Sequence, residues 1–330
     1  MKAIYMSKYA YRLEQVYSKR MKEEFSKIFD IEDIVYNKEN LKNSQDVEVI
    51  LSTWDMPKYT EEEIKALFPK LKAIFYSAGS VQYFARPFLN LGIKVFSAWQ
   101  ANAVPVIDFA VSQILLATKG YFLLSSLAKK DYNSAREMMN LFPGNYEAKI
   151  GILGYGVIAK GAVKKLLPQS RIEIYVYAPD FSKEEADKLG IHKANTLDEI
   201  FTNCDVISNH IANLPSTLGI INKDLINKLH DYQTFINTGR GQQVDENALL
   251  EKCKNNPLIT AVLDVTYPEP PLQDSLYFKL DNVFVSPHIA GSSGHEVIRM
   301  AEFMLEEAKH YLNNEKCKYE VTLKMLETMA

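Results

Sequence analysis

The stretch KIGILGYGVIAK, residues 149–160, decides the fold of this chain. A β-type run leads directly into a turn and then a helical pattern, and the turn fits the consensus GxGxxA. Gly154 permits a tight turn, and Gly156 lets the backbone approach a pyrophosphate at the helix N-terminus. Chance glycine spacing is the competing interpretation, but the strand–turn–helix context favours a dinucleotide-binding turn. The turn comprises Gly154, Tyr155, Gly156, Val157, Ile158 and Ala159.

Strand-like and helix-like segments alternate on both sides of this turn. The later β-type runs are Lys149–Leu153, Glu173–Tyr177, Asp205–Ser208, Thr234–Asn237, Thr260–Leu263 and Val283–Ser286. The earlier ones are Lys2–Met6, Ile34–Tyr36, Val47–Ser52, Ala73–Tyr76 and Lys94–Ser97. This alternation predicts an α/β protein with parallel strands, and the six later strands suit a doubly wound sheet. A long helical pattern begins near Pro105, which we expect in its first turn, and a final helix covers about Glu296–Leu312.

The composition is that of a globular protein and argues against several classes of partner. The chain has 330 residues, with 38 Lys and Arg against 41 Asp and Glu and a net charge of -3. This balance argues against nucleic acid or an acidic membrane bound by bulk electrostatics. Because no unbroken apolar run reaches about 18 residues, no membrane-spanning helix is expected. The N-terminal stretch lacks the features of a signal peptide.

The cysteines and histidines indicate neither a disulfide framework nor a metal site. Cys204, Cys253 and Cys317 lie far apart, and an odd number of isolated cysteines fits poorly with paired disulfides. The six histidines show no ligand-like cluster, so no metal is expected. We therefore expect a reducing, cytoplasmic compartment.

The residue that would contact the cofactor's adenosine ribose is not fixed by the sequence. NAD-specific sites often place Asp or Glu about 20 residues after the glycines. Ala178 occupies that position, Asp180 follows two residues later, and Lys183 is the nearby cation. Asp180 either binds the ribose 2′-hydroxyl or caps the next helix, and both interpretations stay open. NAD is expected, and NADP remains possible.

Three polar residues follow three later β-type runs. Arg240, Glu269 and His288 each come at the carboxyl end of a predicted strand, where doubly wound sheets bind ligands. Alone, each has an ordinary explanation as an ion-pair partner, a solvated loop charge or a helix-entry residue. Together, after a dinucleotide turn, they form a set suited to proton transfer and carboxylate binding.

The order and spacing of these motifs resemble the D-isomer-specific 2-hydroxyacid dehydrogenase family. Besides the glycine turn, the matching segments are Ser208–Thr217, Asn237–Gly241 with Val244-Asp245, Asp264–Pro270 and His288–Gly291. The resemblance implies NAD(P)-dependent hydride transfer between a 2-oxo acid and a D-2-hydroxy acid, with Arg240, Glu269 and His288 as the catalytic residues. It places Asp264 beside the nicotinamide. The cofactor-binding residues it implies are Gly154, Tyr155, Gly156, Val157, Ile158, Ala178, Asp180, His210, Ile211, Ala212, Thr217, Thr238, Gly239, Arg240, Asp264, His288, Ala290 and Gly291.

The resemblance also implies a domain organisation and an oligomeric state. It implies two Rossmann-like doubly wound domains: a split substrate domain, 1–102 plus 292–330, and an NAD(P)-binding domain, 103–291. The substrate would lie between them, and the helix near Pro105–Leu124 would contribute to a homodimer interface. Four residues depart from the family pattern: Ser80 stands where glycine is common, Asp108 where Glu is usual, Ala178 where an acid is usual and Ala212 where proline often sits.

The substrate itself is weakly encoded. The resemblance implies that Trp54, Ala78, Gly79, Ser80, Arg240 and His288 contact it, with backbone N–H groups near Ala78–Ser80 holding its carboxylate. The loop Ser52–Met56 contains no Arg or Lys, so a small or apolar 2-oxo acid is expected rather than phosphoglycerate. Trp54 and Trp99 either shape this pocket or are ordinary packing residues. An NADH-sensing, corepressor-like protein is the main alternative function, and formate oxidation is disfavoured because Gln would be expected at Glu269.

Overall fold

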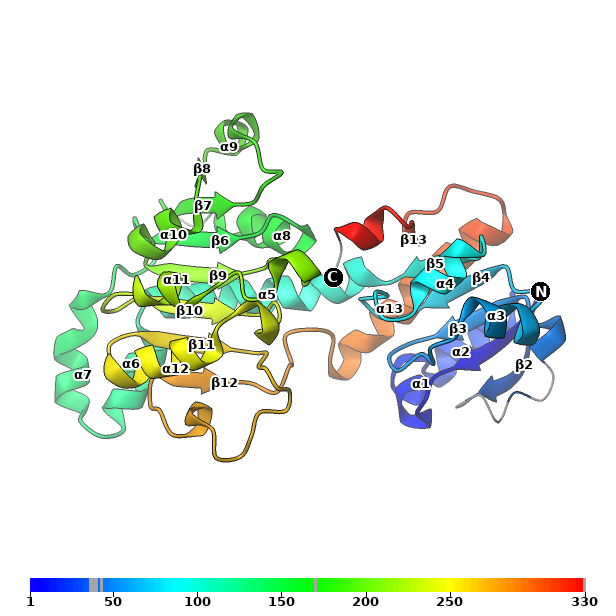
Figure 1. Cartoon of the computed structure of the whole chain (residues 1–330), viewed down its shortest axis with the longest axis horizontal. Helices are drawn as coiled ribbons and strands as arrows, with labels where there is room; N and C mark the ends of the chain where they lie inside the picture. The colour runs from blue at the N-terminus through cyan, green and yellow to red at the C-terminus, as the bar shows by residue number, and fades with distance from the viewer. Residues whose placement is uncertain (36–40, 42–43, 169–170, 329–330) are drawn as a thin grey trace. The chain divides into compact units, whose positions relative to one another are not determined.

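The chain divides into two compact units (Figure 1). The computed structural model describes residues 1–35, 41, 44–168 and 171–328. Unit 1 comprises Met1–Ala103 and Ser292–Ala330, and unit 2 comprises Val104–Gly291. Each unit is built around its own largely parallel sheet, which confirms the predicted α/β class with two doubly wound sheets.

Unit 1 contains a six-stranded sheet with the order β13-β5-β4-β3-β1-β2. Its strands are β1 (Lys2–Met6), β2 (Asp30–Val35), β3 (Val49–Ser52), β4 (Ala73–Tyr76), β5 (Lys94–Ser97) and β13 (Glu320–Val321). All neighbours are parallel except β13, which pairs antiparallel with β5. The chain leaves β1 first for β2 and then for β3 on the other side, so the strand order reverses between β1 and β3. Tyr36, the last residue of one predicted run, lies outside the described residues.

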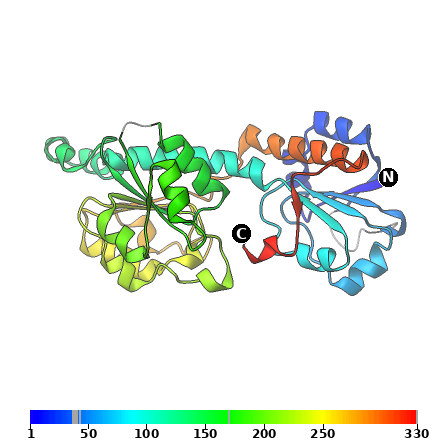
Figure 2. The same ribbon diagram turned by 90° about the horizontal axis from the view of Figure 1, so that it is seen from above.

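Helices cover both faces of the unit 1 sheet (Figure 2). They are α1 (Ala10–Val16), α2 (Lys19–Ser26), α3 (Glu61–Leu67), α4 (Ala85–Asn90) and α13 (Val297–Leu312). The amphipathic stretch at 12–29 forms two helices because Ser18 starts a second one, accepting a hydrogen bond from the Met21 N–H. Aromatic and methionine side chains from strands and helices, among them Phe25, Phe75 and Met304, form one hydrophobic core.

Unit 2 contains a seven-stranded, fully parallel sheet with the order β12-β11-β10-β9-β6-β7-β8. Its strands are β6 (Lys149–Leu153), β7 (Glu173–Tyr177), β8 (His192–Lys193), β9 (Val206–Asn209), β10 (Thr234–Asn237), β11 (Thr260–Leu263) and β12 (Val283–Val285). All six predicted strands are present, and the two-residue β8 was not predicted. The strand order reverses between β6 and β9, which places a ligand crevice beyond the carboxyl ends of these strands.

Two sets of helices enclose the unit 2 sheet. The helices α10 (Leu197–Asn203), α11 (Lys223–Asn227) and α12 (Glu246–Asn255) contribute to one apolar layer. The helices α5 (Trp99–Thr118), α8 (Val157–Leu166) and α9 (Lys183–Leu189) contribute to the other. Two further helices, α6 (Tyr121–Ala128) and α7 (Tyr132–Met138), pack on each other.

Helix α5 differs from its prediction in both position and length. It begins at Trp99 rather than near Pro105, and Pro105 lies inside it. The prediction was wrong because it relied on the preference of proline for a first turn, whereas an interior proline is tolerated at the cost of one backbone hydrogen bond. The helix also ends at Thr118, before the predicted end at Leu124, and α6 begins at Tyr121.

Among the described residues, α5 is also the one helix long and apolar enough to cross a membrane, judged by length and composition alone. Polar residues interrupt its sequence, so a search for an unbroken apolar run did not identify it. In the structure 56% of its most apolar 18-residue window is buried. Its residues Val111, Ile114 and Ala117 belong to the core of unit 2, which is how the core helix of a globular domain packs.

Candidate active site

The turn between β6 and α8 leaves backbone N–H groups available for a ligand. Gly154 has φ +85°, and an added Cβ would lie 2.7 Å from the His210 carbonyl oxygen, so only glycine fits there. Gly156 is the N-cap of α8, and no described side chain caps that helix. An added Cβ at Gly156 would meet nothing within 4 Å. The start of α8 is therefore open, and its N–H groups and positive dipole end suit a pyrophosphate.

The other helices around this sheet show what α8 lacks. A side-chain oxygen caps each of α9, α10, α11 and α12 by accepting a hydrogen bond from an N–H of the first turn; the caps are Ser182, Thr196, Asn222 and Asp245. Because an uncapped N-terminus leaves donors unsatisfied, and because α8 follows β6 where the strand order reverses, the residues of the glycine turn fit a nicotinamide dinucleotide.

The loop after β7 shows which residue caps the next helix, one of the two roles considered for Asp180. Ser182, not Asp180, caps α9, because its hydroxyl accepts the Glu185 N–H at 3.0 Å. The capping interpretation of Asp180 is therefore wrong, and its side chain lies exposed. Lys183 pairs with Asp187 at 2.6 Å. Ala178 is buried in the core, with 4% of its surface exposed.

The loop after β9 lies against the glycine turn. The His210 N–H donates to the Leu153 carbonyl at 2.8 Å. Its ring lies between two hydroxyls, with Nε2 2.9 Å from Ser208 Oγ and Nδ1 3.4 Å from Thr238 Oγ1. Burial lowers the pKa of His210 to about 4, so the ring is neutral at physiological pH. Thr217 fixes the rest of the loop by donating its hydroxyl to the Ala212 carbonyl at 2.7 Å.

A buried amide network, which the sequence analysis missed, joins the loops after β9 and β10. The Asn209 side-chain NH₂ donates to Asn237 Oδ1 at 3.0 Å and to Gln243 Oε1 at 2.8 Å. Gln243 in turn donates to the Ile211 carbonyl at 2.8 Å. Asn209 and Asn237 are paired in register at the ends of adjacent strands. The available signal was the Asn directly after one predicted strand and at the end of the other. The network fixes the loop that carries Arg240, because Gln243 Oε1 also accepts the Arg240 N–H at 3.2 Å.

Glu269 and His288 form a close pair at the carboxyl edge of the unit 2 sheet. His288 Nδ1 lies 2.6 Å from Glu269 Oε1, and both side chains are partly open to solvent. Arg240 is half-buried; burial lowers its pKa and the nearby Glu269 charge opposes that effect, so the guanidinium stays charged. Its Nη1 donates to the Gly239 carbonyl at 2.7 Å. The structure thus pairs Glu269 with His288 and places both near enough to Arg240 for the Glu269 charge to act on it.

Asp264 holds the backbone that carries His288. Its carboxylate accepts hydrogen bonds from Ser286 Oγ at 2.6 Å and from the N–H groups of Ile289 and Ala290, both at 2.9 Å. The His288 N–H donates to the Asp264 carbonyl at 3.0 Å, and His288 has φ +55°. A non-glycine residue with positive φ requires support from its surroundings. Asp264 supplies that support, in addition to its predicted place beside the nicotinamide.

The predicted substrate loop lies in unit 1, after β4. The Ser97 hydroxyl donates to the carbonyls of Ala78 and Gly79, at 3.0 and 2.5 Å. Because a trans peptide points its C=O and N–H in opposite directions, the N–H groups of Gly79 and Ser80 face away from Ser97. This orientation suits the predicted role of these N–H groups in binding a carboxylate.

Two tryptophans were considered for the substrate pocket. Trp54 follows β3 and is half-buried, and the Arg12 guanidinium lies 5.5 Å from the centre of its ring. Thr53 Oγ1 donates to the Ser77 carbonyl at 3.0 Å, which ties the Trp54 loop to the predicted carboxylate loop. Trp99 packs edge-on against Tyr319 at 5.8 Å and, like Trp54, is partly buried against the core of unit 1.

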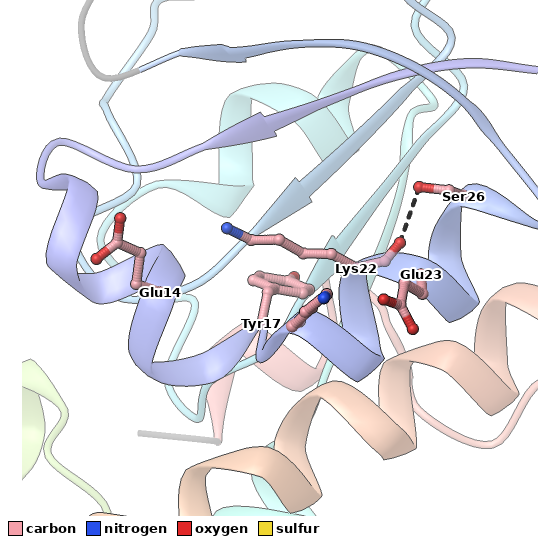
Figure 3. A pocket seen from close by; sticks show the side chains of 6 residues that line it. Glu14, Tyr17, Lys22, Glu23 and Ser26 are labelled. Carbon is pink, nitrogen blue, oxygen red and sulfur yellow. Dashed lines mark hydrogen bonds between the residues drawn. The ribbon is translucent and has the colours of Figure 1, made fainter.

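A hollow on the surface of unit 1 is formed by another set of residues (Figure 3). It is lined by Glu14, Tyr17, Lys19, Lys22, Glu23 and Ser26, from α1 and α2 and the turn that joins them. Ser26 donates its hydroxyl to the Lys22 carbonyl at 2.8 Å. None of the predicted site residues lines this hollow. In the described part of the chain, no group of three or more His, Cys, Asp or Glu side chains is placed to hold a metal ion.

Comparisons with known proteins show the family to which the chain belongs. The family model for the NAD binding domain of D-isomer specific 2-hydroxyacid dehydrogenases matches residues 112–290, more than half of the chain. A D-3-phosphoglycerate dehydrogenase of Archaeoglobus fulgidus is 29% identical over 216 residues, covering 66% of this chain and 40% of that relative. A hydroxypyruvate reductase of Thermotoga maritima is 30% identical over 229 residues, covering 66% of this chain and 69% of that relative.

A solved structure shows the same fold over almost the whole chain. The apo form of D-mandelate dehydrogenase from Rhodotorula graminis has a TM-score of 0.80 at 17% identity, with 97% of each chain covered. At this level of identity the likeness concerns the fold.

Proposed function

Because the chain belongs to the D-isomer specific 2-hydroxyacid dehydrogenase family, we propose that it is an NAD-dependent oxidoreductase that interconverts a 2-oxo acid and a D-2-hydroxy acid. The observation that carries this proposal is the His288–Glu269 pair, with Nδ1 and Oε1 2.6 Å apart. The Glu269 charge also acts on Arg240, where it raises the pKa of the guanidinium. A proton donor, its orienting carboxylate and a fixed cation are the groups that carbonyl reduction next to a carboxylate requires.

The cofactor would be held by the residues around the glycine turn. The N–H groups at the start of α8 would bind the pyrophosphate, and the loop after β9, from His210 to Ala212, would line the site. When bound, a nicotinamide dinucleotide supplies or accepts the hydride. The open space at Gly156 and the uncapped helix support this assignment.

His288 would move the proton through Nε2. Its Nδ1 is occupied by Glu269, which fixes the orientation of the ring. In reduction, Nε2 gives its proton to the C2 oxygen of the 2-oxo acid; in oxidation it accepts that proton back. Arg240 would bind the carboxylate with its two-pronged guanidinium and polarise the C2 carbonyl.

We further propose a substrate with an uncharged side chain. The sequence of the loop Ser52–Met56 contains no cation, but the structure adds Arg12 from α1. Arg12 Nε bonds Asp55 Oδ2 at 3.1 Å, and the guanidinium lies over the Tyr11 and Trp54 rings. Because Asp55 neutralises this cation, Arg12 is not a free charge for a phosphate, and the Tyr11 and Trp54 rings lie against it.

One assay tests the activity and the substrate class together. We expect NADH oxidation with 2-oxo acids that carry small, aliphatic or aromatic side chains, and little with 3-phosphohydroxypyruvate. Formate with NAD should give no turnover. A preference for the phosphorylated substrate would contradict the assignment of the Arg12–Asp55 pair.

A dinucleotide-sensing protein is the alternative function on the same scaffold. Tight NADH binding without turnover of any 2-oxo acid would favour it. The His288–Glu269 pair supports the enzyme, since a sensor requires no proton donor at this place.

We propose that NADH is preferred over NADPH. Asp180 is exposed after β7, and Lys183, the cation that could bind a 2′-phosphate, is paired with Asp187. Asp180→Ala should lower the ratio of kcat/KM for NADH over NADPH by roughly tenfold, since one charged hydrogen bond is worth about 1.5 kcal/mol or more. Asp274→Ala, an exposed change in another loop, is the control. An unchanged ratio would remove Asp180 from the site.

We also propose a homodimer. Large apolar side chains lie exposed along α5, α6, α7 and the segment after them, namely Leu116, Tyr121, Tyr132, Met139 and Leu141. Exposed apolar side chains gathered in one stretch indicate an association surface. Light scattering at micromolar concentration should give twice the 37.6 kDa chain mass, and a monomer would contradict the proposal.

A further inference from the structure

Glu246 is a nearly buried carboxylate that the proposed reaction does not use. It is the first residue of α12, directly after the N-cap Asp245, and only 8% of its surface is exposed. Its place at a helix N-terminus stabilises a negative charge. A buried carboxylate is costly unless hydrogen bonds compensate it, so its partners indicate why it is there.

The partners of Glu246 belong to the loop that carries Glu269. Its Oε2 accepts the Tyr267 N–H at 2.7 Å and the Tyr277 hydroxyl. Its Oε1 is buried and has no hydrogen-bond partner within the described residues. Tyr267 lies two residues before Glu269, so this carboxylate holds the loop close to the acid that orients His288.

The same loop packs tightly against the backbone next to Arg240. A Cβ at Gly241 would lie 2.2 Å from the Thr266 carbonyl carbon and 2.6 Å from the Tyr267 nitrogen. Glycine at 241 is therefore required for the two loops to meet. The segment 266–267 is thus fixed on one side by Gly241 and on the other by Glu246, directly before Glu269.

We propose that Glu246 is a positioning residue of the proposed dehydrogenase, which holds Glu269 against His288 through the Tyr267 N–H and adds negative charge behind that pair. The inference rests on the proposed function, because it acts on the proton-transfer pair. Glu246 can hold Glu269 in place because its Oε2 accepts the Tyr267 N–H, two residues before Glu269. The hydrogen bonds from Tyr267 and Tyr277 and the N-terminus of α12 stabilise the negative charge of this carboxylate.

Opposing effects act on the ionisation of the Glu246 carboxylate. Burial raises the pKa of Glu246, the hydrogen bonds from Tyr277 and Tyr267 oppose that effect, and the Glu269 charge raises the pKa further. The titratable groups that face this carboxylate are Tyr277, from the turn Leu276–Phe278, and Glu269. Those near Glu269 are Arg240 and His288. Removing the Glu246 charge should therefore make His288 easier to deprotonate.

Two substitutions distinguish the effect of Glu246 on the position of Glu269 from the effect of its charge. Glu246→Asp keeps the charge but is too short to hold Tyr267, so kcat for 2-oxo acid reduction should fall about 10- to 100-fold, with KM for the substrate little changed. Glu246→Gln keeps an oxygen for the Tyr267 N–H but removes the charge. It should lower kcat less, and should move the basic limb of the kcat/KM profile for reduction to lower pH. Glu251→Gln, which removes an exposed charge from the same helix, should change neither.

A measurement without turnover keeps this inference distinct from the proposed activity. NMR titration of the six histidines, with the His288 signal assigned by its loss in His288→Gln, gives the pKa of His288 directly. That pKa should be lower in Glu246→Gln than in the wild type and in Glu251→Gln, with NADH affinity unchanged. If Glu246→Gln and Glu251→Gln titrate alike, or if Glu246→Asp keeps kcat within twofold, Glu246 is a structural residue only. A wild type without turnover, but with the expected shift, would overturn the proposed function and leave the charge effect standing.

Discussion

The strand order reverses between β1 and β3 in unit 1 and between β6 and β9 in unit 2. The loops at these two places differ in how their backbone groups are bonded. In unit 1, the Ser7 hydroxyl donates to the Trp54 carbonyl at 2.8 Å and the Lys8 N–H donates to the Asp55 carbonyl at 2.9 Å. These bonds bridge the loops after β1 and β3. In unit 2, Gly154 and Gly156 leave the start of α8 uncapped. The helix α1, which follows β1, also has no side-chain cap. The topology thus supplies a crevice in both units, and the units differ in the glycines of the turn rather than in helix capping.

The polar residues at the two carboxyl edges differ in the same sense. In unit 1 they are fully buried hydroxyls that bond to neighbouring backbone, as Ser52 does to the Met6 carbonyl and Ser97 to the Ala78 carbonyl. In unit 2 the edge carries Glu269 and His288, titratable groups that stay partly open to solvent. Buried, satisfied hydroxyls stabilise a fold, whereas an exposed pair of titratable groups is available for chemistry.

The largest expected effect comes from removing the proton donor of unit 2. His288→Gln should lower kcat for 2-oxo acid reduction by about 10²- to 10⁴-fold, because general acid–base catalysis contributes that much. NADH affinity, measured by fluorescence quenching, should stay within a few-fold of the wild type. A variant that keeps more than a tenth of kcat would show that His288 is not the donor.

The second largest effect is expected from a substitution that caps the N-terminus of α8 in unit 2. Gly156→Asp would give α8 the side-chain cap that α9 to α12 already have, and would set a negative charge where the pyrophosphate binds. We expect NADH affinity to fall about 100-fold, as for a loss of roughly 3 kcal/mol, while the folded state keeps its stability. Gly156→Ala, which fits the open space, separates bulk from charge and should bind NADH more tightly than Gly156→Asp. Equal affinities would show that no anion binds at this turn.

The third effect concerns the neutral histidine beside the glycine turn. The pKa of His210, about 4 in the folded protein, lies below its usual value near 6.5. Between pH 4 and 6.5 the unfolded chain therefore binds more protons than the folded protein. The stability that the neutral His210 gives the folded state is present above pH 6.5 and is lost as the pH falls toward 4. The thermal midpoint should drop over this window, by an amount corresponding to at most about 3 kcal/mol. His210→Gln should flatten that drop, and His230→Gln, at an exposed site, should not; equal slopes would contradict the burial of His210.

The sequence predicted what depends on local pattern. The six longer strands of unit 2 were predicted because apolar runs and turn residues recur at strand spacing, and the glycine turn because its residues are consecutive. The two-residue β8 carries too little pattern to be seen. Helix α5 began earlier than predicted because the interior Pro105 was taken as a start.

The site residues that were missed depend on contacts distant in sequence. Gln243 meets Asn209 across 34 residues, and Glu246 meets Tyr267 across 21. No local pattern marks such pairs, and only the packing of the strand-end loops brings them together. The two interpretations of Asp180 were likewise separable only when Ser182 proved to be the cap.

The smallest expected effect lies in unit 1 and tests the other half of the comparison. Ser7→Ala removes the hydroxyl that bridges to the Trp54 carbonyl and leaves that carbonyl without its donor, which should cost about 1–2 kcal/mol of stability. Both tryptophans, Trp54 and Trp99, belong to unit 1, so tryptophan fluorescence during urea unfolding reports on this unit. The control, Ser26→Ala, removes an exposed hydroxyl that also bonds a carbonyl, and should change stability by less than about 0.5 kcal/mol. NADH affinity should be the same in both variants, because the residues that fit the cofactor lie in unit 2. If Ser7→Ala weakens NADH binding as strongly as Gly156→Asp does, the carboxyl edge of the unit 1 sheet also contributes to cofactor binding, and the contrast between the two units is wrong.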